Sequence, residues 1–226
     1  MLFRELAKFL NIAERKENLP PRSIIDGVPY YSQWESPPLV RKIIRDEILA
    51  QDDPLWRKSG AKSREEYELW AGNMCGMACL KMIVEHKFGK RISIITLGKR
   101  CMEFGGYIER GKTINGLYYR PFIRFIEQEF ELQGKVIGNL SLNRIMKELS
   151  QKNYVVASVS HKIRYPDVEP VTNGGHLILM LGYDLDKEIL LFHNPSGDTT
   201  ENQEYAKISF SRFSKFFAGR GIIIER

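Results

Sequence analysis

The residues best suited to chemistry in this sequence are a cysteine at the start of an apolar helix and a histidine at the start of an apolar strand. Cys75 begins the run Cys-Gly-Met-Ala-Cys-Leu. The unpaired amides of a first helical turn favour a thiolate over a thiol, and Gly76 leaves room for a substrate backbone. A thiolate can attack a carbonyl carbon if a base lies within hydrogen-bond reach. Taken alone, Cys75 could equally be a buried structural cysteine, an alternative that fits Cys79 well.

Four histidines compete for the role of base. His86 follows Cys75 on the same predicted helix by roughly 16 Å of rise, which is too far for contact. His161 lies in a loop-like stretch that we expect to border a cleft and not to work in it. His176 follows two glycines at the start of a strand, where a polar side chain can face a cleft. His193 is expected to point to the other face of its own strand.

The strand that begins at His176 also suggests an orienting group for the imidazole. This strand runs into the turn signal Asp-Leu-Asp-Lys, and a turn centred on Leu185 places His176 opposite Asn194. The side-chain carbonyl of Asn194 could then hold the imidazole by its ring N–H. Asp198 is a weaker candidate for the orienting group, because the turn at 195–197 would have to fold it back toward His176. The structural alternative is a buried polar pair that pins the hairpin.

The elements that must position these residues change character along the chain. Helical patterns occupy 2–16, 39–70, 73–88, 122–130 and 142–149, the second of them broken by turn signals. Extended or strand-like patterns occupy 28–33, 154–159, 177–183, 188–192 and 221–225. Residues 177–181 are apolar on both faces, as in a covered central strand. Helices first and antiparallel strands afterwards predict an α+β fold.

Composition excludes several classes of protein. The 226 residues are 43% hydrophobic and 27% charged, which is typical of a globular chain. No apolar run is long enough to cross a membrane, and charges at Arg4, Glu5 and Lys8 interrupt any signal peptide. Three cysteines do not make a disulfide framework, so a cytoplasmic location is expected. The net charge of +6 comes from runs of alternating sign, which does not indicate nucleic-acid binding.

Four motifs occur in a specific order along the chain. They are Val28-Pro-Tyr-Tyr-Ser-Gln33, Cys75-Gly-Met-Ala-Cys-Leu-Lys-Met82, Gly175-His-Leu-Ile-Leu-Met-Leu-Gly-Tyr-Asp184 and Asn194-Pro-Ser-Gly197. Together they resemble the papain-like cysteine peptidases, specifically the bacterial branch related to the peptidase domains that process bacteriocin leaders. The resemblance implies an N-terminal helical half packed on a C-terminal antiparallel sheet over residues 26–226. Residues 1–25 are then a helical extension with a linker, and 39–70 a helical insertion.

By position, the resemblance implies that Cys75 is the nucleophile, His176 the general base and acid, and Asn194 the orienter of the imidazole. The branch commonly has Asp at this third position; an asparagine orients the ring but adds no charge. Gln33 is implied as a side-chain donor of the oxyanion hole, beside the backbone N–H of Cys75. The expected reaction is hydrolysis of a peptide or isopeptide bond through a thioester. It needs no metal or cofactor, and no zinc-ligand spacing or phosphate-binding loop occurs.

The substrate itself is not named by these motifs. Trp34, Trp70 and Gly175, with Tyr107, are candidate residues of the substrate subsites, although aromatic residues more often belong to the core. A peptide or protein is the expected partner, and neither nucleic acid nor a membrane is expected. Two alternatives stay open: acyl transfer to another acceptor, as in transglutaminases or cyclases, and a degenerate module that binds peptides without cutting them. A basic nucleic-acid-binding protein ranks last.

Overall fold

A large antiparallel sheet forms one half of the molecule. The computed structural model describes residues 19–226, and every strand pair in it is antiparallel. The strands of the large sheet are β1 (Arg22–Ile24), β4 (Gly134–Ile137), β5 (Tyr154–Ser160), β6 (Gly175–Asp184), β7 (Ile189–His193), β8 (Ala206–Ser209) and β9 (Phe217–Ile224). Their order is β4-β9-β5-β6-β7-β8, with β1 paired to the far end of β6. A separate hairpin joins β2 (Tyr107–Arg110) and β3 (Thr113–Gly116).

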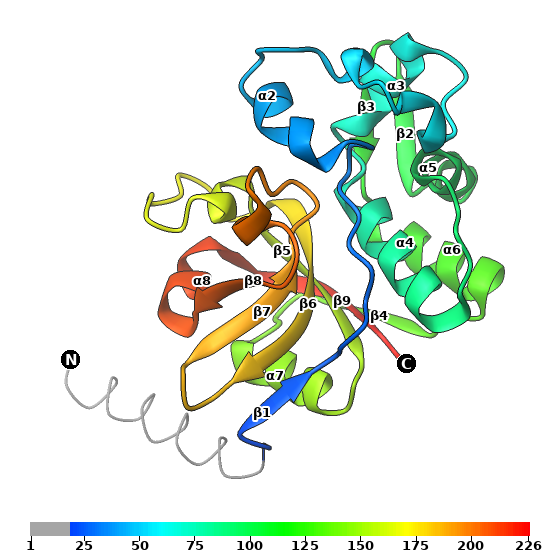
Figure 1. Ribbon diagram of the computed structural model, residues 1–226. Helices are drawn as coiled ribbons and strands as arrows, with labels where there is room; N and C mark the ends of the chain where they lie inside the picture. The colour runs from blue at the N-terminus through cyan, green and yellow to red at the C-terminus, as the bar shows by residue number, and fades with distance from the viewer. Residues whose placement is uncertain (1–18) are drawn as a thin grey trace.

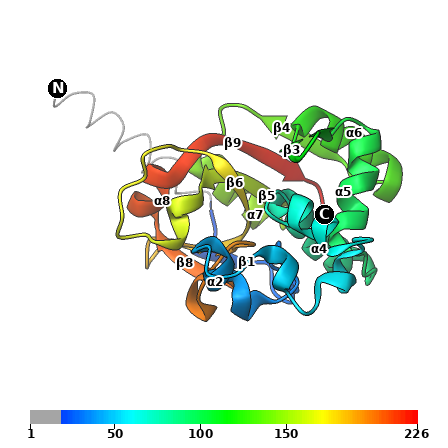
Figure 2. The same ribbon diagram turned by 90° about the horizontal axis from the view of Figure 1, so that it is seen from above.

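The helices gather mainly beside the sheet, in the half that precedes it in sequence (Figure 1). They are α2 (Val40–Ile44), α3 (Arg64–Ala71), α4 (Cys75–Phe88), α5 (Ile94–Glu103), α6 (Tyr119–Phe130), α7 (Leu142–Ser150) and α8 (Phe210–Phe216). Short 3-10 turns lie at η1 (Pro37–Leu39), η2 (Ala50–Asp52), η3 (Trp56–Ser59), η4 (His161–Arg164) and η5 (Thr200–Asn202). The view from above shows α4 and α5 at one side of the sheet and α8 at the other (Figure 2). This arrangement confirms the predicted α+β fold.

The central strand β6 ties the two halves together. Both α4 and α7 contact β6, and all of its residues from His176 to Asp184 are buried. An apolar strand covered in this way needs no polar face, which explains the uninterrupted run at 177–181. The prediction of a covered central strand is therefore confirmed.

Helix boundaries follow local signals in the sequence. Helix α4 ends at Gly89, whose φ of 66° is the left-handed conformation that terminates helices. Ser141 caps α7 by accepting a hydrogen bond from the backbone N–H of Arg144. Helix α4 begins at Cys75 without a side-chain cap, because its capping residue is Met74. The amides of its first turn are therefore not used by a capping side chain.

Several elements differ from the sequence-based expectation. The stretch 39–70 is divided into η2, η3, α2 and α3, and residues 28–33 run without strand pairing. Strands β4 and β8 and the β2–β3 hairpin are not among the expected elements, because four-residue strands with polar residues carry little periodic signal. Helix α5 is also absent from the expectation, although it is ten residues long. Strand β1 lies within the predicted linker and belongs to the sheet. The helix predicted over 2–16 lies outside the described residues.

The segment 28–36 crosses from the sheet to α4. Figure 1 shows this part of the chain, drawn in blue, rising from β1 between the sheet and the helices. The backbone N–H of Gln33 donates to the carbonyl of Pro195 at 2.9 Å, and the Tyr30 hydroxyl donates to the carbonyl of Asn194 at 3.0 Å. On the other side, the Tyr31 hydroxyl donates to Glu85 of α4. These bonds hold the loop after β7 in place beside the start of β6.

Candidate active site

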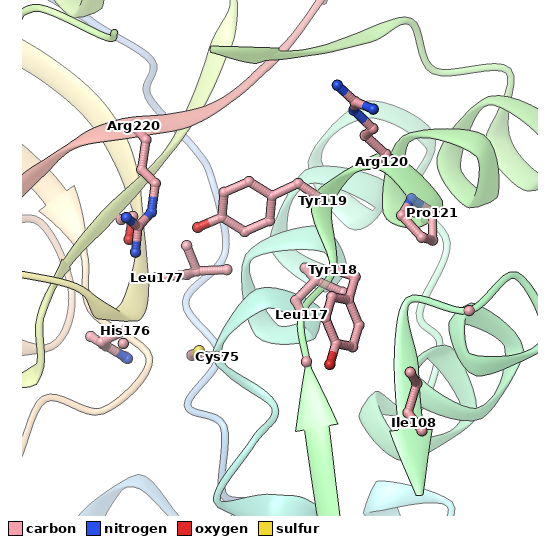
Figure 3. Close-up of a pocket in the computed structure, with 14 residues that line it drawn as sticks. Cys75, Ile108, Leu117, Tyr118, Tyr119, Arg120, Pro121, His176, Leu177 and Arg220 are labelled. Carbon is pink, nitrogen blue, oxygen red and sulfur yellow. The ribbon is translucent and has the colours of Figure 1, made fainter. Parts of the chain in front are cut away.

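The sulfur of Cys75 opens into a cavity of about 750 Å³ between the helical half and the sheet. His176 lines the same cavity, and Figure 3 shows its ring and the Cys75 sulfur facing each other at one end. Cys75 comes from the first turn of α4 and His176 from the start of β6. The contact between α4 and β6 is therefore what brings the two residues together.

The pKa of Cys75 is raised above its ordinary value, and burial is the main cause. Backbone hydrogen bonds from Leu177, Gly76 and Cys75 itself act in the opposite direction and stabilise the thiolate. The expectation that the helix start favours a thiolate is therefore wrong for the resting protein, since desolvation of the sulfur outweighs the amides. At neutral pH, Cys75 rests as a thiol.

The imidazole of His176 is held by Asn194. Its Nε2 lies 2.8 Å from Oδ1 of Asn194, and both side chains are buried. Burial lowers the pKa of His176 to about 3, although the bond to Asn194 acts the other way. The ring is therefore neutral at neutral pH. Because Asn194 Oδ1 only accepts, Nε2 carries the proton and Nδ1 is left as the basic nitrogen.

Two residues that sequence reasoning missed complete this network. The Ser196 hydroxyl lies 3.0 Å from His176 Nε2 and accepts a hydrogen bond of 2.7 Å from Nη2 of Arg164. The backbone N–H of Ser196 also donates to Asn194 Oδ1 at 3.1 Å. Burial lowers the pKa of Arg164, whose charge in turn lowers the pKa of His176. Ser196 lies within the motif Asn194–Gly197, whereas no sequence signal singled out Arg164.

The predicted strand register is wrong, although the predicted contact is present. The turn spans 185–188, so Leu179 pairs with His193 and β7 ends there. Asn194 reaches His176 from the loop that follows β7 and not from a position opposite it on the ladder. Asp198 is not part of this contact, since its carboxylate accepts from Tyr165 and Asn202.

The other histidines lie outside the site. His193 is buried with Nε2 3.0 Å from the carbonyl of Val28 and with Nδ1 accepting from the backbone N–H of Tyr205 at 2.9 Å. His86 is bonded through Nδ1 to the Tyr154 hydroxyl at 2.6 Å. Each of these two imidazole rings is hydrogen-bonded to a residue other than Cys75. His161 is exposed and does not line the cavity.

Gln33 lies beside the turn that precedes α4, but its amide is already engaged. Nε2 donates to the carbonyls of Ala71 and Gly72 at 3.1 and 2.9 Å, so both of its N–H bonds are used. The structure thus does not present Gln33 as a free oxyanion donor. It could take that role only if one of these bonds were exchanged for a bond to the oxyanion.

Of the predicted substrate-binding residues, Gly175 lines the cavity and the tryptophans do not. Trp70 is 1% exposed and packs edge-on against Tyr107, which is also buried, so both belong to the core. Trp34 lines a separate cavity of about 440 Å³. The expectation for Gly76 also needs correction, because a Cβ there would lie 2.7 Å from the Leu117 side chain. Its missing side chain admits Leu117 and not substrate.

Most of the cavity wall comes from residues that carried no functional signal in the sequence. Figure 3 shows side chains from the β2–β3 hairpin, the start of α6 and β9 around the space beside Cys75. The lining residues beyond the predicted ones are Gly105, Ile108, Gly116, Leu117, Tyr118, Tyr119, Arg120, Pro121, Ser158, Leu177 and Arg220. Apolar and aromatic groups with two arginines therefore line the cavity that Cys75 and His176 share.

The described residues 19–226 contain neither a candidate metal site nor a candidate membrane-spanning helix. No three His, Cys, Asp or Glu side chains in this range lie where they could hold a metal ion. None of the helices in the same range has the length and apolar character needed to cross a bilayer.

Comparison with known proteins places the chain in a family. The family model described as the Peptidase_C39 like family matches residues 25–221. The crystal structure of a proposed C39-like peptidase from Bacillus anthracis is similar over 91% of this chain and 98% of that chain, with a TM-score of 0.54 and 15% identity. The peptidase domain of Streptococcus ComA, a bifunctional ABC transporter involved in a quorum-sensing pathway, matches over 68% of this chain and 92% of that chain, with a TM-score of 0.46 and 15% identity. A search of curated proteins gave no match. The chain therefore belongs to the Peptidase_C39 like family, the papain-like bacterial cysteine peptidases that its motifs resemble.

Proposed function

We propose that this protein is a cysteine peptidase that hydrolyses a peptide or isopeptide bond with Cys75 as nucleophile, His176 as base and acid, and Asn194 as the residue that orients the imidazole. The observation that carries the proposal is the bond from His176 Nε2 to Asn194 Oδ1, at the edge of the cavity into which Cys75 opens. This bond leaves Nδ1 of a neutral ring to accept the thiol proton. Family membership supports the same reaction class.

Both partners rest uncharged, which sets the order of events in the reaction. The Cys75 thiol transfers its proton to Nδ1 of His176 as the sulfur attacks the substrate carbonyl carbon. The carbonyl oxygen becomes an oxyanion, and the backbone N–H of Cys75 at the start of α4 is the donor we assign to it. His176 then protonates the leaving amine, which departs and leaves a thioester on Cys75. Water, deprotonated by His176, hydrolyses the thioester and restores the thiol.

The decisive experiment is labelling with a peptidyl electrophile, followed by mass-spectrometric identification of the modified cysteine. We expect Cys75 to be the modified residue, because Cys79 and Cys101 are fully buried and act as internal controls. Labelling should disappear in Cys75→Ala and fall strongly in His176→Ala. The Cys101→Ala variant, which changes a cysteine outside the cavity, should be labelled as the wild type is.

Turnover separates hydrolysis from the rival reactions. Peptide pools incubated with the wild type and with Cys75→Ala should differ by products that carry a new carboxyl terminus. Products joined to an added amine would instead indicate acyl transfer. Labelling of Cys75 without any product would favour a module that binds peptides only, and equal activity in Cys75→Ala would refute the nucleophile.

A further inference from the structure

One end of the cavity carries polar groups that are not paired with other side chains. Arg220, Tyr119 and Ser158 all line it. Within residues 19–226, neither an ion pair of Arg220 nor a side-chain hydrogen bond of these three residues is found. None of the described lining residues is an aspartate or a glutamate. The guanidinium group of Arg220, which is exposed, therefore has no acidic neighbour among the residues that line the cavity.

The guanidinium of Arg220 lies against the backbone just before His176. A Cβ placed on Gly174 would be 3.0 Å from Nη2 of Arg220 and 3.7 Å from the Ser158 hydroxyl. Gly174 and Gly175 have φ angles of 133° and 88°, which other residues rarely adopt. Gly174 thus leaves the space beside the start of β6 that the guanidinium occupies, next to the Ser158 hydroxyl.

Tyr119 approaches the same guanidinium from the opposite wall. Figure 3 shows its ring crossing the cavity above Cys75, with its hydroxyl directed toward Arg220. The other arginine of the wall, Arg120, extends away from Cys75 in the same view. Donors from β9, α6 and β5 therefore converge on one end of the cavity. Arginine presents paired N–H donors whose spacing matches the two oxygens of a carboxylate.

We propose that Arg220, with the hydroxyls of Tyr119 and Ser158, binds a carboxylate of the peptide substrate while the scissile carbonyl lies at Cys75. This carboxylate belongs to an acidic side chain or to the C-terminus of the peptide. The inference rests on the proposed peptidase function, for which it names the class of substrate. The net charge of +6 on the chain favours encounter with acidic peptides.

Binding to the Cys75→Ala variant tests this subsite without depending on catalysis. The probes are two matched pairs of N-acetylated alanine pentapeptides. The first pair carries Glu or Gln at the third position with an amidated end, and the second pair has only alanine with a free or amidated C-terminus. Dissociation constants come from NMR titration, with the Nε–H signal of Arg220 as the local reporter. We expect one acidic probe to bind more tightly than its neutral partner by about tenfold, as expected for one charge-assisted hydrogen bond.

Variants locate the source of that preference. Arg220→Gln in the Cys75→Ala background should bring the acidic and neutral probes to equal affinity. Arg124→Gln removes the same charge from α6, where the arginine bonds the Phe104 carbonyl, and should leave the preference unchanged. Preference for the internal Glu identifies a side-chain carboxylate, and preference for the free end identifies a terminal one. Two results overturn the proposal: equal binding of acidic and neutral probes to Cys75→Ala with Arg220 in place, or a preference for the acidic probe that survives Arg220→Gln.

The outcome is separable from that of the peptidase proposal. A protein whose Cys75 does not react with electrophiles, but which still prefers acidic probes through Arg220, has the subsite without the proposed activity. A protein that cleaves peptides with no difference between Glu and Gln substrates has the activity without the subsite.

Discussion

Nε2 of His176 lies 2.8 Å from Oδ1 of Asn194, and this single bond determines which ring nitrogen can act on the thiol. The amide oxygen accepts and carries no charge, so it fixes the tautomer, and its hydrogen bond raises the pKa of His176 by less than burial lowers it. Burial lowers the pKa of His176 to about 3 and raises that of Cys75. The resting pair is therefore a thiol and a neutral imidazole, which have to exchange a proton during attack.

The pH dependence of Cys75 alkylation tests this neutral resting pair. Since the pKa of the thiol is raised, the thiolate fraction is small at pH 7 and grows as the pH rises. The rate constant for reaction with iodoacetamide should increase by about tenfold per pH unit between pH 6 and 8, because only the thiolate reacts. Mass spectrometry confines the measurement to Cys75. A rate independent of pH in this range would indicate a preformed thiolate–imidazolium pair.

Replacement of the orienting amide by a carboxylate should convert the neutral pair toward an ion pair. In Asn194→Asp, an anion beside Nε2 raises the pKa of His176 and favours the imidazolium. The substitution loses no hydrogen bond from Nδ2, which has no partner among the described residues. We expect faster alkylation of Cys75 near pH 6 and an acid limb of kcat/KM that moves to higher pH. Asn139→Asp, an exposed loop substitution that adds the same charge, is the control.

Ser196 is expected to act as a positioning residue for the imidazole. Its hydroxyl lies beside His176 Nε2 and accepts from buried Arg164, so Ser196→Ala removes one acceptor from each. We expect kcat to fall by about threefold to tenfold with little change in KM, because a neutral hydrogen bond contributes about 0.5–1.5 kcal/mol. Ser150→Ala, which removes a hydroxyl bonded only to the Lys147 carbonyl, should have no effect on kcat. A rise in KM alone would assign Ser196 to substrate binding.

The parts of the fold with strong local signals could be predicted from the sequence. Helix α4 has an apolar run that ends at Gly89, and β6 is a long apolar strand, so both were located. The register of the hairpin could not be predicted because it depends on the turn, where Glu188 adopts a positive φ of 50°. A turn whose centre lies one to two residues further along the chain than expected moves every cross-strand partner.

The site was predictable only where single residues stand at the ends of elements. Cys75, His176 and Asn194 each follow such a boundary, and the last two are in contact despite the wrong register. The cavity wall was not predictable, because Tyr119 and Arg220 come from distant segments whose meeting depends on the whole fold. The desolvation of the sulfur also cannot be read from the sequence, so the expected direction of the shift in the Cys75 pKa is wrong.

Gln33 should prove more important for stability than for the oxyanion. Its amide satisfies the carbonyls of Ala71 and Gly72, in the turn before α4. Gln33→Ala should lower the free energy of unfolding by about 1–3 kcal/mol, because two hydrogen bonds of about 0.5–1.5 kcal/mol each are lost, one of them to the buried Ala71. Denaturant titration measures this change. We expect kcat to fall less than tenfold at temperatures where the variant is folded. An unchanged stability with a kcat loss of about 10²–10³ would instead assign the amide to the oxyanion.

Acid should destabilise the protein through its two buried neutral histidines. Burial lowers the pKa to about 3 for His176 and to about 4 for His193, whereas an unfolded chain has a histidine pKa of about 6.5. Below pH 6.5 the unfolded state therefore binds more protons, and stability is lost as the pH falls toward 4 and then 3. Each histidine contributes a slope of at most about 1.4 kcal/mol per pH unit in this window.

The variant His193→Gln isolates one of these contributions. A protonated His193 could no longer accept from the backbone N–H of Tyr205, whereas a glutamine amide does not titrate. Thermal unfolding at pH 7 and pH 4.5 should show a smaller loss of Tm on acidification for His193→Gln than for the wild type. The exposed His161 serves as the comparison: its pKa is also lowered by partial burial, but less than that of His193, so His161→Gln should keep most of the wild-type difference. The same acid loss in wild type and His193→Gln would mean that carboxylates, and not the buried imidazole, set the acid limit of the fold.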